Sequence, residues 1–147
     1  MFAVGPQPID SASLANGVRT DACGAVVLFS GVVRSLSDKL QPVTGLHYEA
    51  HAEMAVAEFQ TIAREARERF GPCEIAAVHR TGDLSVGEVA VAVAVASPHR
   101  AQAFDACEFM IDQIKARAPI WKKEHYAGGA SCWRENDCQS APHSSPA

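Results

Sequence analysis

The sequence predicts a single α+β domain in which helices pack on a mixed or antiparallel sheet. Its 147 residues are 48% hydrophobic and 20% charged, which supplies enough apolar material for one core. Helical and strand patterns alternate along the chain without an internal repeat. The domain is expected to span residues 1–138, followed by a flexible C-terminal tail, residues 139–147, that is rich in Ser and Pro.

The first half of the chain is expected to form one short helix, two strands and one long helix. Residues 11–15 precede Asn16-Gly17, a pair that commonly ends a helix. The apolar segments 25–34 and 44–50 are predicted strands on either side of a polar loop. From residue 53 to residue 70, apolar side chains recur at helical spacing and are backed by charges. The stripe predicted to face the core consists of Ala55, Phe59, Ile62, Ala63, Ala66 and Phe70.

Two further strands are predicted over residues 74–80 and 88–96. In the second of these, valine and alanine alternate strictly. Because successive side chains of a strand point to opposite faces, one face carries the large side chains and the other the small ones. A helix can therefore pack closely against the alanine face.

The next apolar stripe predicts a helix whose face is formed by Phe104, Cys107, Ile111 and Ile114. Ser97 is expected to be its N-cap, with Pro98 at the first helical position. Pro119 is expected to end it, because proline lacks a backbone donor and forces the preceding residue toward extended geometry. Strand or loop structure should resume at residue 120, and residues 132–135 are predicted to add an edge strand.

Cations surround the break at Pro119. Lys115 falls in the last turn of the helix and Lys122 follows the proline, so the reversal of the chain is expected to bring two amines into one pocket. The alternative is an ordinary helix C-terminus, where cations complement the helix dipole. His99 and Arg100 are expected in the first turn of the same helix, where free N–H groups favour an anion such as phosphate. A plain cap with solvated side chains is the alternative there.

Arg34 is a third candidate anion ligand. It follows the strand 25–34, in which Gly31 predicts a bulge or a close backbone approach. A guanidinium at a strand end suits bidentate capture of phosphate or carboxylate, although a solvated surface arginine is the more common outcome.

Composition excludes several other functions. The net charge of −4 and the sequence pI near 5.8 argue against a nucleic-acid binder. The longest Val/Ala run is about half the length of a membrane span, so no membrane association is expected. The odd number of cysteines predicts a reducing, cytoplasmic location, and their spacing predicts neither a metal site nor a redox pair. The cysteines are Cys23, Cys73, Cys107, Cys132 and Cys138.

The histidines add no metal site to this interpretation. His47 and His51 are four residues apart but fall on either side of a predicted strand-to-helix boundary, which argues against metal ligation. His79 is interpreted as a structural residue that closes a turn.

Five segments in this order carry a specific signal: Val4-Gly-Pro-Gln-Pro8; Gly24-Ala-Val-Val27 with Phe29-x-Gly-x-Val-Arg34; His79-Arg-x-Gly-x-Leu84 with Gly87-Glu88; Ser97-x-His-Arg100; and Lys115-x-Arg-Ala-Pro-x-Trp-Lys122. Together they resemble the large, catalytic subunit of molybdopterin synthase over about residues 4–135. The resemblance implies an α/β-hammerhead-like fold and no cofactor. It also implies sulfur transfer to cyclic pyranopterin monophosphate, which forms the molybdopterin dithiolene.

In that family the sulfur arrives as the C-terminal thiocarboxylate of a small ubiquitin-like subunit. The resemblance implies a homodimer of the large subunit within a heterotetramer, with pockets that draw on both protomers. It makes Lys115 and Lys122 the catalytic residues, without deciding which of them acts as acid or base. The substrate-binding residues that it implies are Val32, Val33, Arg34, His99, Arg100, Lys115, Lys122, Lys123 and Glu124.

The chain departs from the family near its C-terminus. Many members have an arginine just before the tryptophan matched by Trp133, and another basic residue a few positions later. Here Cys132 and Asn136-Asp137 occupy these places, and Arg134 is the candidate to compensate. Two other classes of function remain open at this level. One is a noncatalytic adaptor that grips a partner's acidic tail, and the other is a hydrolase or phosphotransferase, for which no nucleophile or metal carboxylates are apparent.

Overall fold

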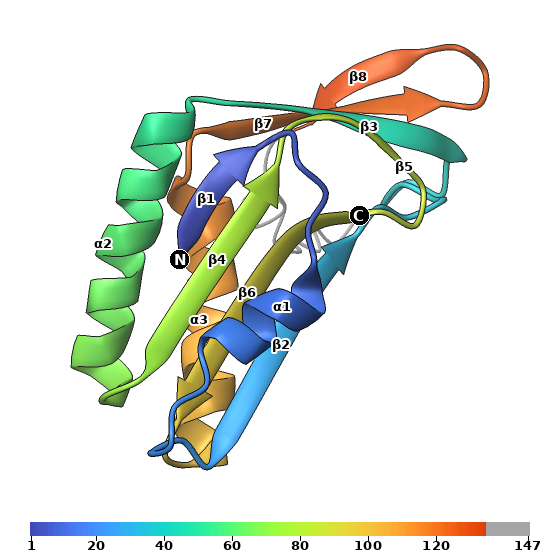
Figure 1. Cartoon of the computed structure of the whole chain (residues 1–147). Coiled ribbons are helices and arrows are strands. Elements are labelled where there is room, and N and C mark those ends of the chain that lie inside the picture. Colours follow the sequence, from blue (N-terminus) through green and yellow to red (C-terminus); the bar gives the residue numbers. More distant parts are fainter. Residues whose placement is uncertain (135–147) are drawn as a thin grey trace, which may run out of the picture.

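The computed structural model describes residues 1–134, which form two four-stranded sheets and three helices (Figure 1). The predicted tail, residues 139–147, and Cys138 lie outside the described residues. The first sheet has the strand order β1-β4-β6-β2. In it β1 and β4 are parallel, and the other neighbours are antiparallel. The bounds of these strands are β1 Phe2–Gly5, β2 Ala25–Val32, β4 Glu74–Arg80 and β6 Val89–Ser97.

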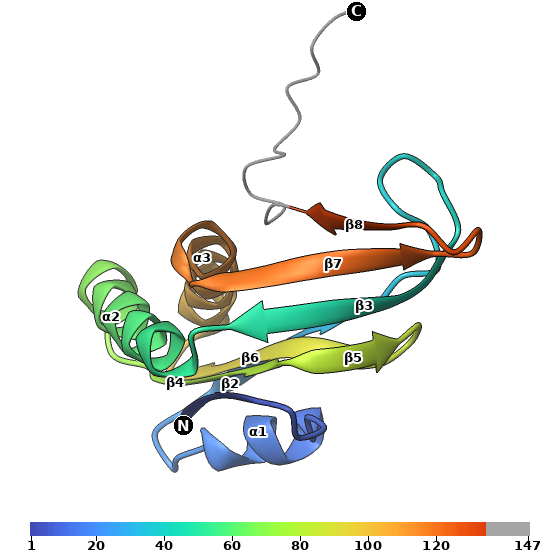
Figure 2. The same cartoon turned by 90° about the horizontal axis from the view of Figure 1, so that it is seen from above.

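Helices cover both faces of the first sheet (Figure 2). The helix α1 (Ser11–Gly17) packs on one face, against the alanines of β6. The helices α2 (Ala52–Phe70) and α3 (Arg100–Arg117) pack on the other face, against the valines of β6. The prediction that a helix packs on the alanine face of this strand is therefore confirmed. The main core forms on the opposite face, against the valines.

The second sheet has the order β5-β3-β7-β8 and is antiparallel throughout its described pairs. Its strands are β3 Val43–Ala50, β5 Gly82–Ser85, β7 Ile120–Tyr126 and β8 Ser131–Arg134. The α+β prediction of antiparallel and mixed pairing is thus confirmed, with the strands divided between two sheets. The division follows from Thr81 and Gly82, where the chain leaves β4 and begins β5 in the other sheet, with a positive φ of 88° at Gly82.

The start of α3 differs from the prediction. Ser97 remains in β6, where it pairs with Ala25, and its hydroxyl donates to the carbonyl of His99 at 2.6 Å. His99 is the N-cap residue, and the helix begins at Arg100. Ser97 is not the cap because strand pairing extends one residue further than the Val/Ala pattern, which leaves Pro98 outside the helix.

Phe104 is also a correction, because its side chain is 61% exposed and does not join the core. The buried face of α3 consists instead of Ala103, Ala106, Cys107, Met110, Ile111 and Ile114. The 3-4-3 spacing was therefore correct from Cys107 onward and was extended one step too far toward the N-terminus.

The end of α3 is as predicted. Ala118, before Pro119, is extended with φ −70° and ψ 137°, and β7 begins at Ile120. The Pro119 carbonyl accepts from the backbone N–H of His51 at 3.1 Å, which ties this reversal to the junction between β3 and α2. The predicted bulge at Gly31 is present as a register shift between Gly31 and Val32.

Candidate active site

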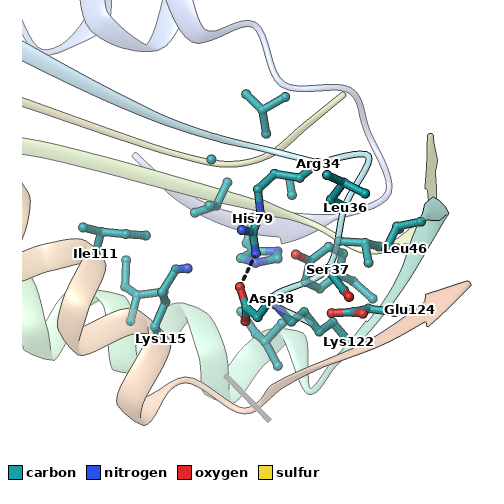
Figure 3. Close-up of a pocket in the computed structure, with 18 residues that line it drawn as sticks. Arg34, Leu36, Ser37, Asp38, Leu46, His79, Ile111, Lys115, Lys122 and Glu124 are labelled. Carbon is teal, nitrogen blue, oxygen red and sulfur yellow. Dashed lines mark hydrogen bonds and ion pairs between the residues drawn. The ribbon is translucent and has the colours of Figure 1, made fainter. Parts of the chain in front are cut away.

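A cavity of about 480 Å³ lies where the two sheets meet the end of α3. Its charged side chains and His79 come from four parts of the chain, namely α3, β7, β4 and the loop between β2 and β3 (Figure 3). The lining side chains that matter for chemistry are Arg34, Asp38, His79, Lys115, Lys122 and Glu124.

The helix, proline and strand place the two predicted lysines in this cavity. Lys115 extends from the last turn of α3, and Lys122 extends from β7 with its side chain largely buried (Figure 3). The end of α3 is fixed by Arg117, which donates to Glu58 at 2.7 Å and to Glu65 at 2.6 Å on α2. An ion-pair network of this kind limits the movement of the helix turn that carries Lys115.

His79 lies between the two sheets and is only 7% exposed. Its Nδ1 lies 2.7 Å from the carbonyl oxygen of Arg80, and its ring packs edge-on against Tyr48 at a centroid distance of 4.8 Å. Burial lowers the pKa of His79 from its ordinary value of 6.5 to about 4, and the charges of Lys115 and Lys122 act in the same direction. The imidazole is therefore neutral near pH 7.

The sequence interpretation of His79 as structural missed its place in the cavity. A signal was present in the two-residue period of the strand. His79 lies on the same face of β4 as Ile75 and Ala77, and that is the face covered by α3. A polar residue that continues this row of apolar side chains lies near the end of α3, which carries Lys115.

The predicted segment 32–34 divides between the cavity and the core. Val32 and Arg34 line the cavity, and Arg34 donates to Asp38 at 2.9 Å in a solvent-exposed ion pair. Val33 is 2% exposed and packs with Leu46 and Leu84, so its side chain does not reach the cavity. Val33 follows the end of β2, and its backbone is held by hydrogen bonds to Glu88 at 3.0 Å and Gly87 at 2.9 Å.

The segment 122–124 divides in the same way. Glu124 lines the cavity, accepts a hydrogen bond from the Tyr126 hydroxyl at 2.8 Å, and lies 3.7 Å from Nε of Arg134. The Nη2 atom of Arg134 donates to the same hydroxyl at 2.8 Å, so Arg134 supports Glu124 across the β7–β8 hairpin. Lys123 does not line the cavity, and its ammonium lies 5.6 Å from the centroid of the Trp133 ring.

His99 and Arg100 do not join the cavity within one chain. They stand at the start of α3, whereas Lys115 lies fifteen residues further along, a separation of about 22 Å along a helix axis. The sequence predicted cationic residues at both ends of α3. In the structure of one chain these two groups of residues lie far from each other.

Among residues 1–134, no cysteine lines the cavity. The four cysteines that the structure describes are free, and burial raises the pKa of the Cys107 thiol to about 11. Within residues 1–134 there is no group of three or more His, Cys, Asp or Glu side chains placed to hold a metal ion. None of the described helices is long and apolar enough to cross a membrane. Two amines, a guanidinium and a neutral imidazole are thus the chemical groups available to an anionic ligand.

Fold and cavity together define a class: a two-sheet α+β domain with a cavity lined by lysine and arginine side chains. A family model described as MoaE protein matches residues 4–117. The chain belongs to this family.

Relatives and solved structures agree with the assignment. The chain is 41% identical over 133 residues to the molybdopterin synthase catalytic subunit of Nostoc sp., covering 90% of this chain and 80% of that protein. It is 47% identical over 113 residues to the corresponding subunit of Rhizobium meliloti, covering 77% and 70%. The crystal structure of molybdopterin synthase from Staphylococcus aureus superimposes with a TM-score of 0.85 at 36% identity, covering 90% and 96%. A complex of subunits 1 and 2 of molybdopterin-converting factor from Helicobacter pylori shares the fold, with a TM-score of 0.71 at 20% identity, covering 91% and 90%.

Proposed function

We propose that this chain is the catalytic subunit of molybdopterin synthase, a sulfurtransferase that converts cyclic pyranopterin monophosphate to the dithiolene of molybdopterin. The observation that carries the proposal is the meeting of Lys115 and Lys122 in one cavity, on a chain of the MoaE protein family. The sulfur donor is the C-terminal thiocarboxylate of a small ubiquitin-like subunit. The catalytic unit is the domain of residues 1–138.

The charge of the cavity suits both ligands. A thiocarboxylate and a phosphate are anionic, and charge that develops during sulfur transfer is stabilised by donors already in place in a site shielded from water. Lys115 and Lys122 are the catalytic residues, since each brings a proton-carrying amine to the same space. Arg34, Val32 and Glu124 contribute to the pterin site from the same cavity, and Val33 and Lys123 contribute only through the backbone segments that they share with them.

A second protomer supplies His99 and Arg100. Both residues lie far from the cavity of their own chain, so a phosphate site that uses them together with Lys115 requires another copy. The strand β2 supports such an assembly. It is an edge strand of the first sheet and exposes the apolar side chains of Val26, Leu28 and Val32, which are suited to burial by a partner.

The assembly is a homodimer of this chain with one small subunit at each end, a heterotetramer. The Helicobacter pylori neighbour is a complex of subunits 1 and 2 of molybdopterin-converting factor, and this supports a partner of a second subunit type. The anionic tail of that partner is drawn to the Lys115 and Lys122 amines, and its affinity falls as salt rises. The complex works in the cytoplasm, where free cysteines are kept reduced.

Reconstitution tests the function directly. Purified chain is mixed with the pterin substrate and the thiocarboxylated small subunit, and dithiolene formation is followed over time. The control is the same small subunit ending in an ordinary carboxylate. Turnover only with the thiocarboxylate is the expected result. Tight binding of the small subunit without any dithiolene would identify an adaptor instead.

Hybrid dimers test the shared site. Lys115→Ala and Arg100→Ala chains are each expected to be impaired when assembled alone. After subunit exchange, a mixed dimer contains one site with neither substitution, so part of the activity returns. Proven exchange without recovery would contradict a site built from two protomers.

A further inference from the structure

The cavity contains one buried titratable group that the proposed chemistry does not use. His79 lines it beside Lys115 and Lys122, yet it is neither a cation near neutral pH nor exposed to solvent (Figure 3). Arg34, Asp38 and Glu124 are the other charged groups of the same lining.

The geometry assigns the roles of its two ring nitrogens. A carbonyl oxygen only accepts hydrogen bonds, so the 2.7 Å contact with Arg80 requires the proton to be on Nδ1. In a neutral imidazole the other nitrogen then carries a lone pair and accepts. Because Nδ1 is engaged with the backbone, Nε2 is the nitrogen left for the cavity. The edge-on contact with Tyr48 limits rotation of the ring, so this direction is fixed.

An acceptor at this place has one evident use. A lysine side chain has several rotatable bonds, and holding its ammonium in one position costs conformational entropy. The Lys115 side chain extends from the last turn of α3 into the same cavity as His79 (Figure 3), and its charge lowers the pKa of the imidazole. An acceptor fixed by the backbone prepares the amine before the ligands enter, and misplacement by about 1 Å is enough to slow a reaction about a hundredfold.

We propose that His79 is a positioning residue of the sulfur-transfer site, whose neutral ring is anchored through Nδ1 on the Arg80 carbonyl and presents Nε2 as a hydrogen-bond acceptor to the ammonium of Lys115. This inference rests on the proposed function for its effect on turnover, but not for its geometry.

Two isosteric substitutions separate this role from simple packing. In His79→Asn the amide nitrogen can replace Nδ1 at the Arg80 carbonyl, while the acceptor in the cavity is lost. In His79→Gln the amide oxygen can replace Nε2. In the dithiolene assay, His79→Asn is expected to lower kcat about tenfold or more with little change in KM, whereas His79→Gln stays within about threefold of the parent chain. Equal losses in the two variants, or an Asn variant with normal kcat, would overturn the proposal.

An NMR measurement that needs neither a His79 variant nor turnover keeps the proposal testable. Long-range nitrogen–proton NMR correlations of the His79 ring report which nitrogen is protonated. The expected result near neutral pH is a proton on Nδ1 alone, with an Nε2 signal that moves when Lys115→Met removes the donor. A proton on Nε2, or an Nε2 signal unchanged by Lys115→Met, would refute the positioning role even where sulfur transfer is normal. Absence of sulfur transfer with the expected NMR result would instead refute the proposed function.

Discussion

Replacing His79 by glutamine should remove a defined part of the acid sensitivity of the fold. In the unfolded chain His79 binds a proton as the pH falls below about 6.5, whereas in the folded chain burial delays protonation until about pH 4. The unfolded state therefore binds more protons between these values. The free energy of unfolding has its full His79 contribution above about pH 6.5 and loses it as the pH falls toward 4.

The size of this change in the free energy of unfolding follows from the shift in the pKa of His79. A displacement from 6.5 to about 4, at about 1.4 kcal/mol for each pH unit, corresponds to about 3 kcal/mol. This is a sizeable fraction of the stability of an ordinary domain. Glutamine does not titrate, so the variant lacks this component while it retains the acid sensitivity of the carboxylates elsewhere in the chain.

Urea unfolding followed by circular dichroism, at several pH values from about 7.5 to about 4, measures this difference. The stability of the parent chain minus that of His79→Gln is expected to fall by about 3 kcal/mol across the range. Parallel curves, with a difference that stays constant, would show that the histidine is protonated as easily in the folded chain as in the unfolded one. A neutral His79 in the folded chain at about pH 5 would then be ruled out.

Other parts of the molecule give further predictions. Arg34→Ala and Arg100→Ala should each weaken pterin binding by about 1.5–3 kcal/mol, measured by calorimetry, with a smaller effect on docking of the small subunit; equal losses for both ligands would indicate a structural role instead. Cys107→Ser should retain its turnover per folded molecule but unfold at lower urea, by about 1–3 kcal/mol, because it buries a hydroxyl; loss of turnover together with a persulfide on this residue would contradict a partner-supplied sulfur. Arg117→Ala should lower the free energy of unfolding by about 1 kcal/mol, since its ion pairs are only partly buried; an unchanged urea midpoint would show that the pairs add nothing.

Local patterns were enough to predict most of the fold. The Val/Ala alternation correctly placed a helix on the alanine face of β6, and the stripe in residues 53–70 correctly gave α2. The lysine pair was predictable because a proline next to a helix end determines the backbone locally. These features depend on neighbours in the sequence.

Other features depend on contacts between segments that are distant in the sequence. Ser97 was expected to cap α3, but its pairing with Ala25 of β2 holds it in the sheet. Val33 and Lys123 were grouped with the site, and their side chains lie outside the cavity lining. The strand period placed His79 on the face of β4 covered by helices, but it did not indicate that Lys115 and Lys122 line the same cavity.

The central claim is that Lys115 and Lys122 carry the sulfur-transfer chemistry in one cavity, and turnover of single-lysine variants tests it most directly. Dithiolene formation is measured with saturating thiocarboxylated small subunit for Lys115→Ala and Lys122→Ala. Arg64→Ala is the matched control, since it removes one positive charge from an exposed position on α2. The account predicts near-complete loss for Lys115→Ala, marked impairment for Lys122→Ala and normal turnover for Arg64→Ala, with all three chains folded. Near-normal turnover by both lysine variants would contradict it.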